Sequence, residues 1–67
     1  MDYVAFGKRV RFIRRFHDMT QEQLADVVGI STSFLGHIER GTRAVSVETL
    51  FKLCVVLGVS ADYLIGI

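Results

Sequence analysis

The sequence predicts an all-α domain of five short helices, and three observations lead to this fold class. The chain holds no proline, its apolar residues recur at spacings of three and four, and Ser or Thr residues alternate with Gly at intervals that match short helices. Its 67 residues suffice for a single domain, which we place over residues 1–67. Hydrophobic residues make up 51% of the chain and no segment is of low complexity, so disorder is not expected.

The first helix is expected between Tyr3 and His17. Phe6, Val10 and Ile13 recur at helical spacing and predict one buried face. The opposite side is expected to carry Lys8, Arg11 and Arg15. His17 and Asp18 should end this helix.

Capping residues delimit the second and third helices. Thr20 stands three residues before Gln23, which predicts a capping box at the start of the second helix. Gly29 is suited to the left-handed conformation that ends it. Ser31 is a good N-cap for the third helix, and Gly41 should end that helix. The apolar positions expected to face inward are Leu24, Ala25, Val28, Leu35 and Ile38.

The last two helices follow the same rule. Ser46 is predicted to cap a fourth helix that Gly58 ends, and Ser60 caps a short fifth helix that runs through Leu64. The apolar side of the fourth helix is formed by Leu50, Leu53, Cys54 and Leu57.

Residues 21–40 have the organisation of a helix-turn-helix motif: two short helices joined by a tight turn that contains Gly. Ala25 is small where the third helix should cross the second, and Gly29 tolerates a positive φ. The segment therefore predicts two packed helices, of which the second is presented at the surface.

Several motifs follow one another without an insertion. They are Phe6–Arg11 (FGKRVR), Thr20–Ala25 (TQEQLA), Val28–Ser31 (VGIS), Ile38–Gly41 (IERG), Glu48–Leu50, Leu57–Ser60 and Tyr63–Leu64. Through them the chain resembles the Cro/cI-type (XRE) family of phage and bacterial regulators over essentially its whole length. The resemblance implies a compact five-helix, lambda-repressor-like DNA-binding domain whose helix-turn-helix is formed by helices 2 and 3. It further implies a sequence-specific transcriptional regulator, with repression the commoner outcome in the family.

The resemblance also implies a set of functional residues, with helix 31–40 in the major groove of double-stranded DNA. The base-reading positions are occupied by Thr32, Ser33 and His37. The phosphate-binding positions are occupied by Gln21, Arg40, Thr42 and Arg43. Finally, the resemblance implies a structural ion pair between Arg14 and Glu39, which we expect to fix the recognition helix against the first helix.

The recognition helix differs from the family pattern in one respect that bears on specificity. Residues 31–38 contain no Asn, Gln or Arg, the side chains that give bidentate contacts to bases. Discrimination at each position is therefore expected to be modest, with His37 donating to a guanine acceptor. Gly36 costs roughly 1 kcal/mol inside a helix. It either lets this helix approach a backbone closely or has no function.

Some apolar residues exceed what the predicted core requires. Phe12 and Phe16 occupy positions that are usually polar in the family, and so does Val55. Two interpretations remain open: a wider edge of the core, or an interface with a second subunit or another partner. Candidates for that interface are Phe12, Phe16, Val55, Tyr63, Leu64, Ile65 and Ile67. We expect a homodimer on a palindromic operator, because two-fold dimers match paired half-sites. The alternative is a protein-interaction module of the same fold, such as an antitoxin bound to its toxin.

Other classes of function find no support in the sequence. The net charge of only +1 does not by itself indicate a nucleic-acid binder. Seven of the eight Lys and Arg residues precede residue 44, so one half of the chain is more basic. No spacing of His, Cys or carboxylate residues resembles a metal or catalytic site, so we expect no enzyme, cofactor, metal or small-molecule substrate. The single Cys54 is expected to be a small core residue and fits a reducing interior. No apolar run is long enough to span a bilayer, so a cytoplasmic protein is expected. The family resemblance implies that it is nucleoid-associated and encoded by a bacterium or phage.

Overall fold

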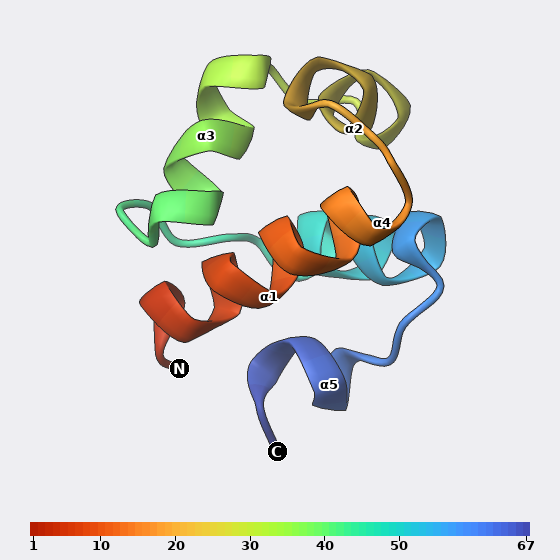
Figure 1. Cartoon of the computed structure of the whole chain (residues 1–67). Helices are drawn as coiled ribbons and strands as arrows, with labels where there is room; N and C mark the ends of the chain where they lie inside the picture. Colours follow the sequence, from red (N-terminus) through yellow and green to blue (C-terminus); the bar gives the residue numbers. More distant parts are fainter.

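The computed structural model describes residues 1–67 and contains five helices and no strand (Figure 1). The helices are α1 (Tyr3–Phe16), α2 (Gln21–Val28), α3 (Thr32–Arg40), α4 (Val47–Leu57) and α5 (Ala61–Ile65). The all-α prediction is confirmed, and so is the order of the elements. Figure 1 shows α1 crossing in front of α4, with α2 and α3 at one end of the molecule and both termini at the other.

Local hydrogen bonds explain where the helices begin and end. Each predicted N-cap hydroxyl accepts from the backbone N–H three residues later, at Thr20, Ser31, Ser46 and Ser60. The capping box between Thr20 and Gln23 is complete, with bonds of 3.0 and 2.9 Å. Gly29 ends α2 in the left-handed region at φ 84°, as predicted. The cap of α1 was missed: Asp2 Oδ1 accepts from the Ala5 N–H at 3.0 Å.

The core lies where α1 packs against α3, α4 and α5 and where α2 packs against α3 and α4. Ten buried apolar residues form it: Phe6, Val10, Leu24, Ala25, Val28, Leu35, Ile38, Leu53, Leu57 and Leu64. The assignment of Leu64 to a partner surface is therefore wrong. Its side chain is completely buried, because α5 folds back onto α1 and α4 and turns this side chain inward. None of the five helices is long and apolar enough to cross a membrane.

Gly7 allows α1 and α3 to pack closely against each other. A Cβ on Gly7 would lie 2.6 Å from the carbonyl oxygen of Glu39 and still closer to that of Ile38. Backbones of α1 and α3 therefore meet at Gly7, where only a hydrogen fits. Gly36 does not meet another helix of this chain: the atoms nearest to a Cβ at this position would belong to the flexible Arg40 side chain. The close approach between two helices of this chain is therefore at Gly7, and the role of Gly36 toward a bound partner stays a prediction.

The two phenylalanines on the outer side of α1 are solvent-exposed. Phe12 is 63% exposed and Phe16 is 74% exposed. Ile13, between them in sequence, packs against the core and closes that edge. The interpretation of these rings as a wider edge of the core is therefore wrong, and their use as an interface stays a prediction.

Candidate nucleic-acid interface

The first turn of α3 presents two small hydroxyl side chains to solvent. Ser31 precedes this turn and uses its own hydroxyl to accept from the Phe34 N–H at 3.0 Å. Thr32 and Ser33 follow it, and both are exposed. Because the cap is satisfied by Ser31, the hydroxyls of Thr32 and Ser33 remain available to an outside partner.

One turn further along α3, His37 is held by the loop that follows the helix. Its Nδ1 lies 2.8 Å from the Thr42 hydroxyl oxygen, and that hydroxyl donates to the His37 carbonyl oxygen at 3.2 Å. The hydroxyl oxygen is thereby left to accept a hydrogen bond from Nδ1. In the neutral ring this arrangement makes Nδ1 the donor and leaves Nε2 as an acceptor. Thr42 thus orients the ring, a contact that the sequence did not reveal.

A buried network fixes α3 to α1 and α2. Arg14 Nε donates to Glu39 Oε2 at 2.6 Å, and Arg14 Nη2 donates to Glu39 Oε1 at 3.0 Å. Gln21, at the start of α2, donates from Nε2 to the same Oε1 at 3.0 Å. Arg14 Nη1 completes the set by donating to the Met19 carbonyl oxygen at 2.8 Å. No buried side-chain polar atom lacks a partner, so the pair is fully satisfied.

The basic residues around the end of α3 are arranged by different contacts. The Arg43 guanidinium lies 5.6 Å from the centroid of the Phe34 ring, within cation–π range. Arg40 is exposed and extends back along α3, where its Nη1 would be 3.1 Å from a Cβ on Gly36. Sequence reasoning missed the support that Phe34 gives to Arg43, because only the fold brings loop and helix together.

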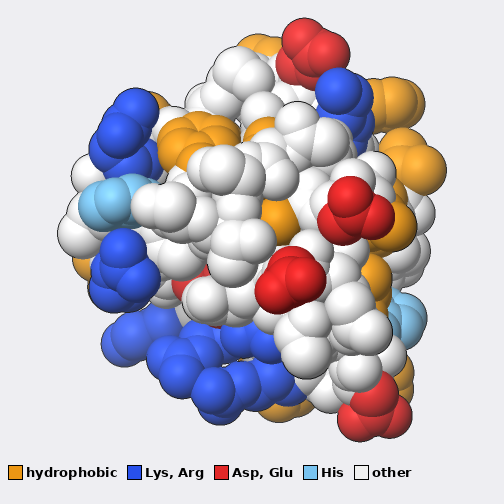
Figure 2. All heavy atoms as spheres, turned by 90° about the horizontal axis from the view of Figure 1, so that it is seen from above, with side chains coloured by type: hydrophobic (Ala, Val, Ile, Leu, Met, Phe, Trp, Pro, Cys, Tyr) orange, Lys and Arg blue, Asp and Glu red, His pale blue; other side chains and the backbone are white.

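Charge is distributed unevenly over the surface that carries α2 and the start of α3. Figure 2 views the molecule from that end, and most Lys and Arg side chains gather on its left and lower left. A histidine lies between two of the basic groups there, while Asp and Glu occupy mainly the opposite side. The low net charge of +1 therefore conceals a basic side and an acidic side.

The structure shows a second apolar surface that sequence analysis largely missed. Val47, Phe51 and Val55 succeed one another every four residues along α4, and all three are exposed. Only Val55 was predicted as a surface residue of this kind. The four-residue spacing was a usable signal, since residues at i, i+4 and i+8 share one helix face. Cys54 lies beside this stripe and is half-buried, and burial raises the pKa of its thiol.

Comparison with known proteins decides the family. A sequence profile described as helix-turn-helix matches residues 10–64, which include all of α2, α3 and α4, the second half of α1 and most of α5. The chain belongs to the Cro/cI-type (XRE) helix-turn-helix family. Members of this family are DNA-binding transcriptional regulators rather than enzymes.

Two curated relatives illustrate the range of the family. The chain is 42% identical over 64 residues to the HTH-type transcriptional regulator YazB of Bacillus subtilis, covering 96% of this chain and 93% of YazB. It is 38% identical over 60 residues to the antitoxin PezA of Streptococcus pneumoniae, covering 90% of this chain. In that case it spans only 38% of the relative's length.

Solved structures agree with the fold. The restriction-modification controller protein C.AhdI from Aeromonas hydrophila superposes with a TM-score of 0.88 at 38% identity, covering 94% of this chain and 96% of C.AhdI. The P22 c2 repressor in complex with a synthetic operator superposes with a TM-score of 0.85 at 32% identity, covering 88% and 89% of the two chains. The fold is therefore lambda-repressor-like, as the family resemblance implied.

Proposed function

We propose that this chain is a sequence-specific transcriptional regulator, a homodimeric repressor that inserts α3 into the major groove of a palindromic operator. The observation that carries the proposal is the first turn of α3. Thr32 and Ser33 are exposed and uncommitted there, while the other side of the same helix is locked by the buried Arg14–Glu39 pair. Rigid support behind a polar, solvent-facing turn is what base recognition requires. The P22 c2 repressor, of similar fold, is described as bound to an operator.

Phosphate contacts would position this helix. Gln21 uses one of the two Nε2 hydrogens for Glu39, so the other is free for a phosphate oxygen at the positive end of α2. Arg40 and Arg43 are exposed beyond the end of α3 and would add charge–phosphate contacts. Thr42, already engaged with His37, would act mainly by orienting that ring.

The His37–Thr42 contact changes the base preference proposed for His37. With Nδ1 donating to Thr42, the neutral ring offers Nε2 as an acceptor. Exocyclic amino groups of adenine and cytosine are the major-groove donors that an acceptor selects. We therefore assign His37 to such a donor rather than to the guanine acceptor suggested by the sequence.

The dimer would form through α4. Val47, Phe51 and Val55 give a stripe of about 12 Å along one helix face. An adjoining apolar groove of about 360 Å³ is lined by Val47, Leu50, Phe51, Cys54, Val59, Ser60 and Ala61. A second copy related by a two-fold axis would bring the same stripe against itself, so that each copy covers the other's exposed side chains. Sedimentation equilibrium should show Phe51→Asp as a monomer and Phe16→Asp, an equally exposed change on α1, as a dimer. Identical behaviour of the two variants would argue against this interface.

Selection of bound sequences from a random duplex pool tests the function as a whole. At about 150 mM salt, non-specific phosphate attraction is already screened. Recovery of a palindrome is expected, and a pool without enrichment would refute sequence-specific binding. With the selected site, Arg43→Gln should reduce the slope of log affinity against log salt by about 0.9 if Arg43 contacts one phosphate. Lys52→Gln, an exposed cation on α4, is the matched control and should leave that slope unchanged.

A second candidate function is a protein-interaction module of the same fold, such as an antitoxin that binds a toxin. It is favoured by the similarity to the antitoxin PezA and by the two exposed phenylalanines of α1. Coexpression with the product of an adjacent gene distinguishes the two. A stable complex that is lost in a Phe12→Ser, Phe16→Ser variant, together with no enrichment of any duplex, would favour this function over the first.

A further inference from the structure

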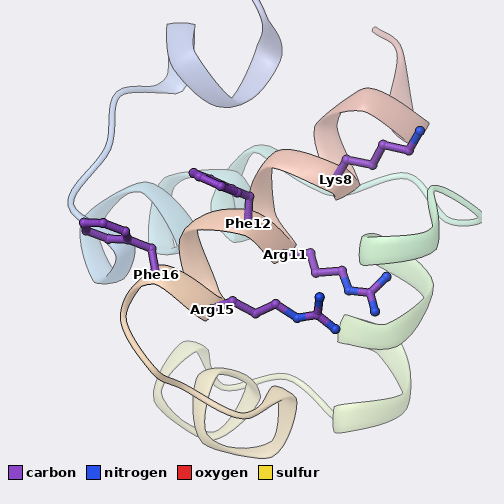
Figure 3. A pocket seen from close by; sticks show the side chains of 5 residues that line it. All are labelled: Lys8, Arg11, Phe12, Arg15 and Phe16. Atoms are coloured by element: carbon purple, nitrogen blue, oxygen red, sulfur yellow. The ribbon is translucent and has the colours of Figure 1, made fainter.

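The outer face of α1 combines exposed aromatic rings with unpaired cations. Phe12 and Phe16 are one helical turn apart and project to the same side of α1 (Figure 3). In the same view, the Arg11 and Arg15 side chains leave α1 on the side opposite the two rings and extend toward α3. Lys8, Arg11, Phe12, Arg15 and Phe16 line a shallow surface hollow of about 470 Å³. We call these five residues the α1 face.

The cations of the α1 face have no partner within the chain. The ion pairs of the structure are Arg14 with Glu39 and Lys52 with Glu48, so none involves this face. Helix α1 contains no Asp or Glu at all. Three positive charges are therefore concentrated on one side of a protein whose net charge is only +1. Such a field attracts an anionic partner.

The aromatic rings indicate which class of molecule the α1 face binds. Two phenylalanines exposed by 63% and 74% place apolar surface beside the cations. Exposed apolar strips bordered by charge are typical of protein-interaction sites. The rings are four residues apart, about 6 Å along the helix, which matches apolar side chains spaced at i and i+4 on a facing helix. Stacked bases of a duplex are closer together, at roughly 3.4 Å.

We propose that the α1 face is a docking site for an acidic amphipathic helix of another protein. Apolar side chains of that helix would cover Phe12 and Phe16, and its carboxylates would lie opposite Lys8, Arg11 and Arg15. The three cations extend over eight residues, about 10 Å, so a partner helix of roughly three turns spans the face. This site is separate from the first turn of α3 and from the α4 stripe, and it does not depend on the proposed binding of DNA or on the homodimer. It uses the same two phenylalanines as the second candidate function and specifies the kind of partner that they would bind.

The test is a titration of the isotope-labelled protein, followed by amide chemical shifts, with a synthetic peptide of about three turns that is cross-linked to hold it helical. It carries Leu at i and i+4, Glu on the side that would face the cations and Ala elsewhere. A peptide of the same composition in scrambled order is the ligand control. We expect shifts confined to α1 and its immediate neighbours with the amphipathic peptide and not with the scrambled one. Absence of shifts at millimolar peptide, equal binding of the scrambled peptide, or shifts that map elsewhere would overturn the proposal.

Variants separate the two components of the site. Phe12→Ser with Phe16→Ser, and independently Arg11→Gln with Arg15→Gln, should each weaken peptide binding at least about tenfold. The salt dependence of peptide binding should be unchanged in the Phe12→Ser, Phe16→Ser variant and altered in the Arg11→Gln, Arg15→Gln variant. Val27→Ser, a change of an apolar side chain on α2 that is 57% exposed, should bind the peptide as the unmodified protein does. All these side chains are exposed, so thermal denaturation should show each variant folded. Tighter binding of oligothymidylate or of phosphatidylserine vesicles to the same face would refute a protein partner.

Discussion

Replacing Glu39 by Gln tests whether the buried network supports the recognition helix. Glu39 accepts two hydrogen bonds from Arg14 and one from Gln21, and both charged side chains are almost completely buried, at 8% and 2% side-chain exposure. The amide of Gln would retain one acceptor, but its NH₂ group would face an Arg14 donor, and the guanidinium would lose its counter-charge. Removing one partner of a buried pair costs about 3–5 kcal/mol, and we expect the lower end, about 3 kcal/mol, because one acceptor survives.

That loss is large relative to the whole molecule. A domain of 67 residues has a free energy of unfolding of about 3–10 kcal/mol. Glu39→Gln should therefore lower the thermal midpoint by roughly 12–24 °C. Urea denaturation followed by far-ultraviolet circular dichroism measures the difference directly. Glu48→Gln is the matched control: it breaks an exposed i,i+4 pair with Lys52 and should cost no more than about 0.5 kcal/mol.

Two outcomes would refute the reasoning. Equal destabilisation by Glu39→Gln and Glu48→Gln would show that burial of the first pair is energetically unimportant. The double variant Arg14→Met, Glu39→Leu should recover most of the lost stability, since matched apolar residues remove both buried charges. Failure of this rescue would mean that the specific hydrogen bonds, rather than the unpaired charge, dominate. DNA affinity of Glu39→Gln, measured where the variant is still folded, reports whether α3 has lost its position.

Three further predictions concern packing and the cysteine. Gly7→Ala should destabilise the protein by about 2 kcal/mol or more, because its Cβ would meet the backbone of α3. Gly36→Ala should instead stabilise it by up to about 1 kcal/mol, and a loss as large as that of Gly7→Ala would contradict the assignment. Leu64→Ala should cost about 2–5 kcal/mol by thermal denaturation, whereas Ile67→Ala should cost no more than about 0.5 kcal/mol, and equal effects would mean that α5 is not docked. Burial raises the pKa of the Cys54 thiol, so its contribution to stability is complete below the unfolded pKa of about 8.5 and is lost as pH rises through the folded value. Urea unfolding between about pH 7 and pH 10 should show a smaller alkaline loss in Cys54→Ala, and parallel pH profiles would exclude this effect.

The network of Arg14, Gln21 and Glu39 shows what the family resemblance predicted and what only the tertiary structure revealed. The Arg14–Glu39 pair was implied by family resemblance and not by spacing, because the two residues are 25 positions apart. Gln21 was expected to bind phosphate, and its bond to Glu39 was not foreseen. Likewise, nothing local to Thr42 indicates that it orients His37. These contacts depend on how the helices are placed against one another.

The sequence by itself determined the helices and their ends. Capping hydroxyls act on an N–H three residues away, and Gly29 adopts a positive φ through its own backbone, so both signals are complete within a few residues. Only the tertiary structure decided which apolar side chains are covered. Leu64 and Phe12 are both apolar residues on amphipathic helices, yet one is buried and the other exposed. The physical reason is that burial depends on which other helix lies over a residue, and that information comes from the packing of the whole chain.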